Sequence, residues 1–321
     1  MFKFPLSVEL DLTYRCNYNC LYCRNGQIEE NEALDFETMK KIIKELKENN
    51  IFSINISGGE PLLHKNFVDI IKLLKENNLV WNLTTNGSLI DGKMAKTLKD
   101  NNINSLFITL TGMNDELDSY HKGNKNTFSK ARKCIENCKK LNIEIYVGYL
   151  LTPYNVCDID NFINFINENG LKAKLMKVKP MGTSLLNQDL YIDDKKYNET
   201  IKYMRSLLGN KLIIGEQNER VEDINCMAGV TSCVIGADYN IYPCVMFLGE
   251  EKVSCGCIKK DSLYNIWNNS KVLSDFRKPR KLANGCNKCI KKEKCHGGCR
   301  GNAYLKTGDY NAVESGCYND L

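Results

Sequence analysis

Hydrophobic and polar residues follow two alternating patterns along the first two thirds of the chain. Residues 7–12, "SVELDL", alternate with the period of a strand, whereas "ETMKKIIKELKENN" (37–50) has apolar residues at helical spacing. Six strand–helix units in series predict parallel strands joined by right-handed crossovers, in a barrel or an open sheet. The predicted strands are 7–12, 51–57, 79–85, 103–110, 143–150 and 172–178, and the predicted helices are 37–50, 66–78, 91–102, 127–141, 158–169 and 193–208.

The regular alternation stops near residue 209, and Gly, Cys and Lys dominate the rest of the chain. We therefore predict an α/β domain over 1–208 and a cysteine-rich domain with little regular structure over 209–321. No apolar run approaches the ~20 residues of a membrane span, and "MFKFPLSVELDL" lacks the zones of a secretory signal. A cytoplasmic protein is predicted, and its net charge of +5 is too small to indicate nucleic-acid binding.

Sixteen cysteines in such a chain are expected to be reduced, and their clustering indicates metal ligands rather than disulfides. The stretch "CNYNCLYC" places Cys16, Cys20 and Cys23 in one loop after the first predicted strand. A structural zinc ion needs four protein ligands, whereas three thiolates on a four-iron cluster leave one iron free to bind something else. The alternative is a zinc site completed by a distant cysteine.

The cysteine spacing, with aromatic Tyr22 before the last cysteine, resembles the signature of the radical S-adenosylmethionine (SAM) enzymes. The resemblance implies a partial (β/α)6 TIM-like barrel and a cluster whose free iron chelates the amino and carboxylate groups of SAM. It further implies reductive cleavage of SAM to a 5′-deoxyadenosyl radical, which abstracts hydrogen from the substrate. Tyr22 is then expected beside the adenine.

Three further segments match the family in its order, each at the end of a predicted strand. "SGGEP" (57–61) resembles the glycine-rich motif that contacts the SAM amino group, and "TTNG" (84–87) resembles the segment after the third strand. "FITLTG" (107–112) occupies the fourth-strand position, where the family often has Ser or Asp. The SAM contacts implied by the resemblance are Tyr22, Ser57, Gly58, Gly59, Glu60, Pro61, Thr84, Asn86, Thr109 and Thr111.

The end of the chain carries "CNKCIKKEKCHGGC", and the upstream stretch "CMAGVTSCVIGADYNIYPC" supplies three more cysteines. Cys-x₂-Cys alone would favour zinc ribbons. The longer pattern instead resembles the SPASM extension of peptide-modifying radical SAM enzymes, although Tyr239 stands where a glycine is usual. By this resemblance, one auxiliary four-iron cluster takes Cys226, Cys233, Cys244 and Cys299, and the other takes Cys286, Cys289, Cys295 and Cys317.

The remaining cysteines and the basic run 277–294 have simpler interpretations. Cys134 and Cys138 share a face of a predicted helix and are expected in the core. Cys157, Cys255 and Cys257 are candidate hydrogen donors to a substrate radical. The basic run is expected to offset the negative charge of a cluster, with RNA binding or an acidic peptide substrate as alternatives.

The leading hypothesis is an enzyme that modifies a peptide or protein, by a thioether or carbon crosslink or by epimerisation of a ribosomal peptide. Sulfatase maturation is disfavoured because Val245 stands where those enzymes have an acidic base. The alternatives are a dehydrogenase of a small alcohol or amino sugar and a zinc-binding nucleic-acid adaptor. An external electron donor such as flavodoxin or ferredoxin is expected. A separate leader-binding protein is also expected, because only about six residues precede the first strand.

Overall fold

The computed structural model of the chain describes residues 2–26, 28, 33–213, 226–280, 282, 286, 288–289 and 292–314. Its sheet has the strand order β10-β9-β8-β1-β2-β3-β4-β5-β6-β7. The strands from β1 to β7 are parallel to their neighbours. They are β1 (Ser7–Asp11), β2 (Ser53–Ser57), β3 (Trp81–Thr85), β4 (Ser105–Leu110), β5 (Glu144–Leu151), β6 (Lys172–Lys177) and β7 (Leu212–Ile213).

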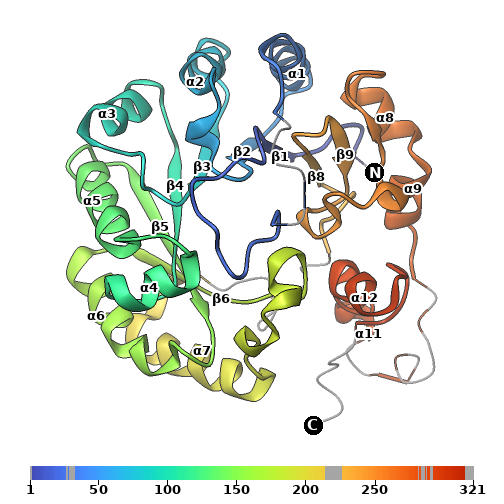
Figure 1. Cartoon of the computed structure of the whole chain (residues 1–321). Coiled ribbons are helices and arrows are strands. Elements are labelled where there is room, and N and C mark those ends of the chain that lie inside the picture. The colour runs from blue at the N-terminus through green and yellow to red at the C-terminus, as the bar shows by residue number, and fades with distance from the viewer. Residues whose placement is uncertain are drawn as a thin grey trace.

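Helices connect these strands and lie on the outside of the curved sheet (Figure 1). In the described part of the chain the sheet begins at β10 and ends at β7, so the expected partial barrel is confirmed. No described helix has the length and apolar character needed to cross a membrane. The helices of this part are α1 (Phe36–Glu48), α2 (Phe67–Glu76), α3 (Gly92–Asp100), α4 (Asp115–Lys122), α5 (Thr127–Lys139), α6 (Ile159–Asn169) and α7 (Asp194–Leu208).

Asparagine ends four of the helices in the same way. Asn50, Asn78, Asn102 and Asn142 each follow a helix and have φ between 52° and 58°, the left-handed conformation. Asn adopts this conformation more readily than other residues with a side chain. In each case the next residue is Ile or Leu, and it is buried. The repeated Asn therefore turns the chain from a surface helix into the core, just before the following strand.

The region after residue 226 continues the barrel sheet. β8 (Ser232–Ile235) pairs in parallel with β1, and β9 (Asn240–Tyr242) pairs antiparallel with β8 and with β10 (Gly256–Cys257). This region contains more regular structure than the sequence indicates, and the predicted boundary at residue 208 stays a prediction. Its helices are α8 (Leu263–Asn269), α9 (Lys271–Arg277), α11 (Lys292–Cys295) and α12 (Arg300–Thr307).

Candidate functional site

The cysteine loop lies inside the curve of the sheet, after β1 (Figure 1). The last turn of α4 holds its backbone: Leu21 N–H donates to the His121 carbonyl (2.9 Å) and Asn19 N–H donates to the Lys122 carbonyl (3.2 Å). Gly123 ends this helix with φ 58°, and a Cβ there would lie 2.5 Å from the Asn19 carbonyl oxygen. Glycine is therefore required at 123 both by the turn and by the contact with the loop.

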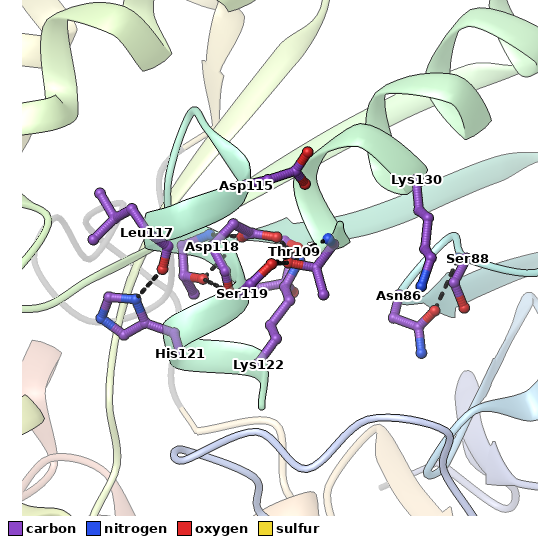
Figure 2. Close-up of polar contacts among 12 residues, drawn as sticks. Asn86, Ser88, Thr109, Asp115, Leu117, Asp118, Ser119, His121, Lys122 and Lys130 are labelled. Carbon is purple, nitrogen blue, oxygen red and sulfur yellow. Dashed lines mark hydrogen bonds and ion pairs between the residues drawn. The ribbon is translucent and has the colours of Figure 1, made fainter. Parts of the chain in front are cut away.

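A buried ion pair supports α4 from inside. Lys122 Nζ lies 2.9 Å from Asp118 Oδ2, and both side chains are almost completely buried. The lysine also donates to the Thr109 carbonyl (2.7 Å), and the other oxygen of Asp118 accepts from the Thr111 backbone and hydroxyl. Figure 2 shows Asp118 and Lys122 on α4 beside Thr109. Thr109 and Thr111, two of the three threonines predicted as SAM contacts, thus belong to the structure that fixes α4.

The glycine-rich motif packs directly on the cysteine loop. Gly59 N–H donates to the Thr13 carbonyl and Glu60 N–H donates to the Arg15 carbonyl, each at 2.8 Å. A Cβ at Gly59 would lie 2.3 Å from the Arg15 carbonyl oxygen, and Gly58 has φ 127°. These glycines allow two backbone segments at the strand ends to touch.

Glu60 joins the second and third strand ends. Its carboxylate is fully buried. The two carboxylate oxygens accept from Thr85 Oγ1 at 2.8 and 2.9 Å, and one of them also accepts from Asn86 N–H at 2.9 Å. Burial raises the pKa of Glu60 to about 7, although these hydrogen bonds oppose the rise. Pro61 follows as the first residue of a short 3-10 helix, Pro61–Leu63. Glu60 is therefore placed to position the 84–87 segment.

Asn86 reaches the cysteine loop, whereas Thr84 points to a neighbouring strand. The Asn86 amide donates to Asn17 Oδ1 (2.8 Å) and lies 4.0 Å from Cys16 Sγ. Thr84 Oγ1 donates to Asn55 Oδ1 in β2 (3.3 Å). Of these two predicted SAM contacts, only Asn86 is placed against the cysteine loop by these hydrogen bonds.

The three thiols of the loop influence one another. Burial raises the pKa of Cys16 to about 11 and that of Cys20 to about 12, and the charge of Cys23 raises both. Lys122 lowers the pKa of Cys20. Burial also raises the pKa of Tyr22 well above its usual value, and Tyr22 lies close to Cys20. Because iron would stabilise the thiolate form that burial disfavours, three convergent thiols of one loop fit a four-iron cluster with one free iron.

Sequence reasoning missed a charged network at the end of this loop. Arg24 Nη2 donates to Glu9 (2.7 Å), Asp11 (3.0 Å) and Ser57 Oγ (3.2 Å). Asp11 is fully buried, and burial raises its pKa to about 7 against the effect of Arg24. The signal was present as an arginine directly after Cys23 and as acidic residues at alternate positions of β1. The network ties the loop to β1 and β2.

A second group of cysteines includes Cys299, which lies close enough to Lys179, two residues beyond the end of β6, to influence its pKa. Arg280 is close enough to Cys226, Cys295 and Cys299 for all three to favour its charged form, although burial lowers its pKa. The Cys299 N–H donates to Glu314 Oε2 (2.7 Å). Burial raises the pKa of Cys299, and the nearby Cys226 raises it further.

The other predicted cluster ligands have different surroundings. Cys289 N–H donates to the Cys286 carbonyl (3.2 Å), so these two share one turn. Cys233 is buried in β8 beside Cys255. Cys317 lies outside the described residues. Among the residues that the structure describes, no three His, Cys, Asp or Glu side chains are arranged to hold a single metal ion.

The remaining candidates lie in three different environments. Cys157 is exposed in the 3-10 helix Val156–Asp158 after β5, and Cys257 pairs with Asn240 in β9. Cys134 and Cys138 are completely buried in the main core, as expected. The hydrogen-donor roles of Cys157, Cys255 and Cys257 stay predictions.

Comparison with known proteins identifies the family of two segments of the chain. Residues 10–166 match the family model of the radical SAM superfamily, and residues 226–290 match that of SPASM, an iron–sulfur cluster-binding domain. Mycofactocin maturase MftC of Mycolicibacterium smegmatis is 23% identical over 309 residues, covering 92% of this chain and 78% of that protein. The AdoMet-dependent heme synthase of Methanosarcina barkeri is 24% identical over 344 residues, covering 99% and 97%.

Streptococcus suis SuiB has a similar fold. Its structure bound to S-adenosylmethionine has a TM-score of 0.81 at 18% identity, covering 98% of this chain and 77% of SuiB. Its structure bound to precursor peptide SuiA has the same TM-score at 17% identity, covering 98% and 76%. The cofactors are SAM and a [4Fe–4S] cluster, with auxiliary iron–sulfur clusters in the SPASM region. The chain is therefore an enzyme of the radical SAM superfamily that carries a SPASM domain.

Proposed function

We propose that this enzyme modifies a peptide. The observation that carries this proposal is that two groups of cysteines, those of the cysteine loop and those near Arg280, border the same edge of the barrel. The cysteine loop lies beyond the end of β1, and Lys179, two residues beyond the end of β6, is affected by the charge of Cys299. A relative named a maturase and a fold relative solved with its precursor peptide support this proposal.

The residues that would hold each cofactor follow from their placement. Cys16, Cys20 and Cys23 would hold the SAM-binding cluster, which when bound supplies the electron that cleaves SAM to a 5′-deoxyadenosyl radical. Asn86 lies against this loop, and Lys122 adds positive charge beside it. The cysteines near Arg280 would hold auxiliary clusters.

The chain's own groups would mainly hold the backbone segments around the cofactors in place. Glu60 holds the Thr85–Asn86 backbone in place, and the Arg24 network fixes the end of the cysteine loop. A crosslink removes two hydrogens and leaves an electron, which an auxiliary cluster would accept. Epimerisation instead needs a hydrogen donor, for which Cys157, Cys255 and Cys257 are the candidates. We further propose flavodoxin or ferredoxin as electron donor, and a separate leader-binding protein.

A second candidate function rests on the relative from Methanosarcina barkeri. The AdoMet-dependent heme synthase aligns over 99% of this chain and 97% of its own length. That near-complete overlap favours haem synthesis as the alternative to peptide modification. It predicts a porphyrin rather than a peptide substrate.

Two measurements test the proposal. Anaerobically reconstituted enzyme is expected to contain about twelve irons, from three four-iron clusters. The reaction is then run in deuterated water with SAM, a reductant and short peptides encoded beside the gene, and peptide masses are measured. Crosslinking lowers the mass by about two hydrogens, whereas epimerisation adds about one deuterium from an exchangeable thiol. Iron near four with stoichiometric zinc would overturn the assignment of two auxiliary clusters. A methylated product, or turnover of a porphyrin precursor alone, would count against the proposed peptide modification.

A further inference from the structure

Two half-exposed tyrosines lie side by side beyond the carboxyl ends of two neighbouring strands. Tyr120 belongs to the last turn of α4, which follows β4, and Tyr154 belongs to the loop after β5. Their exposed fractions are 50% and 45%, and their ring centroids lie 5.6 Å apart at an interplanar angle of 59°. Because the loops after parallel strands share one face of a barrel, both rings lie on the same face as the cysteine loop.

A carboxylate from a third segment adjoins the two rings. Tyr154 Oη donates to Asp189 Oδ2 (2.6 Å), and Asp189 is exposed in the 3-10 helix Gln188–Leu190. This hydrogen bond raises the pKa of Tyr154 to about 12, so the phenol remains a donor at neutral pH. We call Tyr120, Tyr154 and Asp189 the tyrosine patch.

A buried, neutral histidine supports the rings from inside. His121 is completely buried, and its ring centroid lies 5.2 Å from that of Tyr120 and 6.3 Å from that of Tyr154, edge-on to both. Its Nε2 lies 3.0 Å from Thr152 Oγ1, and its Nδ1 lies 2.9 Å from the Leu117 carbonyl oxygen. Burial lowers the pKa of His121. The imidazole therefore places no positive charge behind the rings at neutral pH.

Both sides of the tyrosine patch are attached to the cysteine loop through Leu21. Leu21 N–H donates to the carbonyl of His121, which follows Tyr120 in the chain. The Asn187 amide donates to the Leu21 carbonyl (3.1 Å), and Asp189 lies two residues further along. A ligand on the tyrosine patch would therefore be held beside the loop whose cysteines would hold the SAM-binding cluster.

The chemistry of the tyrosine patch fits a basic side chain. Cations bind to the faces of tyrosine rings, arginine also stacks on them, and an exposed carboxylate pairs with either basic residue. The segment that carries Asp189 also exposes Leu185 and Leu186, whose apolar surface favours a peptide over a small free cation. We propose that the tyrosine patch binds a lysine or arginine side chain of the substrate peptide and so positions that peptide beside the cysteine loop. This inference rests on the proposed peptide modification.

Two peptides of the same shape test this binding directly. The blocked tetrapeptide acetyl-Gly-Arg-Leu-Gly-amide, and the same peptide with neutral citrulline in place of arginine, are titrated against anaerobically reconstituted enzyme with SAM. Saturation-transfer NMR measures both dissociation constants. Wild type should bind the arginine peptide more tightly, and added salt should reduce the difference because it screens exposed charges. Equal affinities for the two peptides would overturn the proposal.

Variants show whether the preference for arginine comes from the tyrosine patch. Tyr120→Leu should weaken binding of the arginine peptide about two- to fivefold, whereas Tyr120→Phe, which keeps a ring, should retain it. Asp189→Asn should weaken binding by up to about fivefold. The matched controls are Tyr203→Leu and Asp160→Asn, because Tyr203 Oη donates to Asp160 (2.8 Å) in an exposed pair between α7 and α6. Unchanged affinity in the patch variants, or equal losses in the controls, would overturn the proposal.

Failure of this proposal can be distinguished from failure of the proposed function. Selective binding of the arginine peptide, without turnover of the peptides encoded beside the gene, would support a site for basic side chains and count against peptide modification. Modification of such a peptide by an enzyme that binds the two tetrapeptides equally would refute the role of the tyrosine patch alone.

Discussion

The two groups of cysteines are built in opposite ways. Cys16, Cys20 and Cys23 come from eight consecutive residues, and backbone hydrogen bonds from α4 and from the 57–60 segment hold their loop. Cys226 and Cys299 come from distant parts of the chain and meet beside charged side chains such as Arg280 and Glu314. The first group is organised by the fold before any iron binds, because its loop backbone is already fixed. The second depends more on the cluster itself to join its segments.

Removing the three loop thiols should produce the largest effect and test whether the two groups are independent. The Cys16/Cys20/Cys23→Ala triple variant should lose all 5′-deoxyadenosine production, since only this loop leaves an iron for SAM. It should retain about eight of about twelve irons. Chromatography of the nucleoside and an iron assay measure both. Normal 5′-deoxyadenosine would refute the assignment of the loop, and loss of all iron would show that the auxiliary group depends on it.

The buried pair under the loop gives the next largest effect. Lys122→Met leaves Asp118 as an uncompensated buried charge, which should cost about 3–5 kcal/mol. A matched control is Lys96→Met, which breaks an exposed pair with Asp100 at the same i,i+4 spacing (3.0 Å). That change should cost about 0.3–0.5 kcal/mol. Anaerobic urea unfolding measures both midpoints.

Equal midpoint shifts for the two lysine variants would mean that the pair does not support α4. Iron content separates the two explanations of a large shift. If Lys122 holds the cysteine loop through α4, the Lys122→Met enzyme should also lose about four irons, whereas a loss of stability without iron loss would confine its role to the barrel.

The barrel was predictable from the sequence because its units repeat a local pattern. The bounds of the six predicted strands agree with those of β1 to β6 to within a few residues. α4 was missed, although Asn114 caps its first turn, acidic residues follow, and Gly123 ends it. Its eight residues are too short to display a helical apolar period. The contacts that matter, such as Lys122 with the cysteine loop, join residues far apart in the sequence.

The auxiliary region shows the same limit more strongly. The cysteine spacing identified a SPASM region, but spacing carries no information on which face of β8 a thiol occupies. Cys233 was grouped with Cys226 and Cys244 for its position in the chain, whereas the alternation of Cys233 and Val234 places these two side chains in different hydrophobic cores. Ligand assignment therefore needs the register of β8 against β1.

Glu60 makes the fixed group sensitive to pH. Its pKa is raised from 4.5 to about 7 by burial, so the folded protein binds more protons than the unfolded chain between these values. Stability from protonated Glu60 is therefore fully present below about pH 4.5 and is lost as pH rises to 7, by up to about 3 kcal/mol. Glu60→Gln, which stays neutral, should gain stability relative to wild type as pH rises from 5.5 to 7. Parallel unfolding midpoints across this range would contradict the buried, hydrogen-bonded carboxyl.

The smallest effect is expected where the glycine motif touches the loop. Gly59→Ala puts a Cβ 2.3 Å from the Arg15 carbonyl oxygen, and a backbone atom cannot move aside as a flexible side chain can. Overpacking of this kind costs about 2 kcal/mol. Gly92→Ala is the matched control, because no atom lies within 4 Å of its new Cβ. At the start of α3, alanine should be neutral or slightly stabilising. Urea midpoints measure both changes, and SAM binding shows whether the loop has moved. Equal midpoints would mean that the loop yields to the new methyl group, and the contrast between a fixed and a cluster-dependent group of cysteines would then fail at its tightest contact.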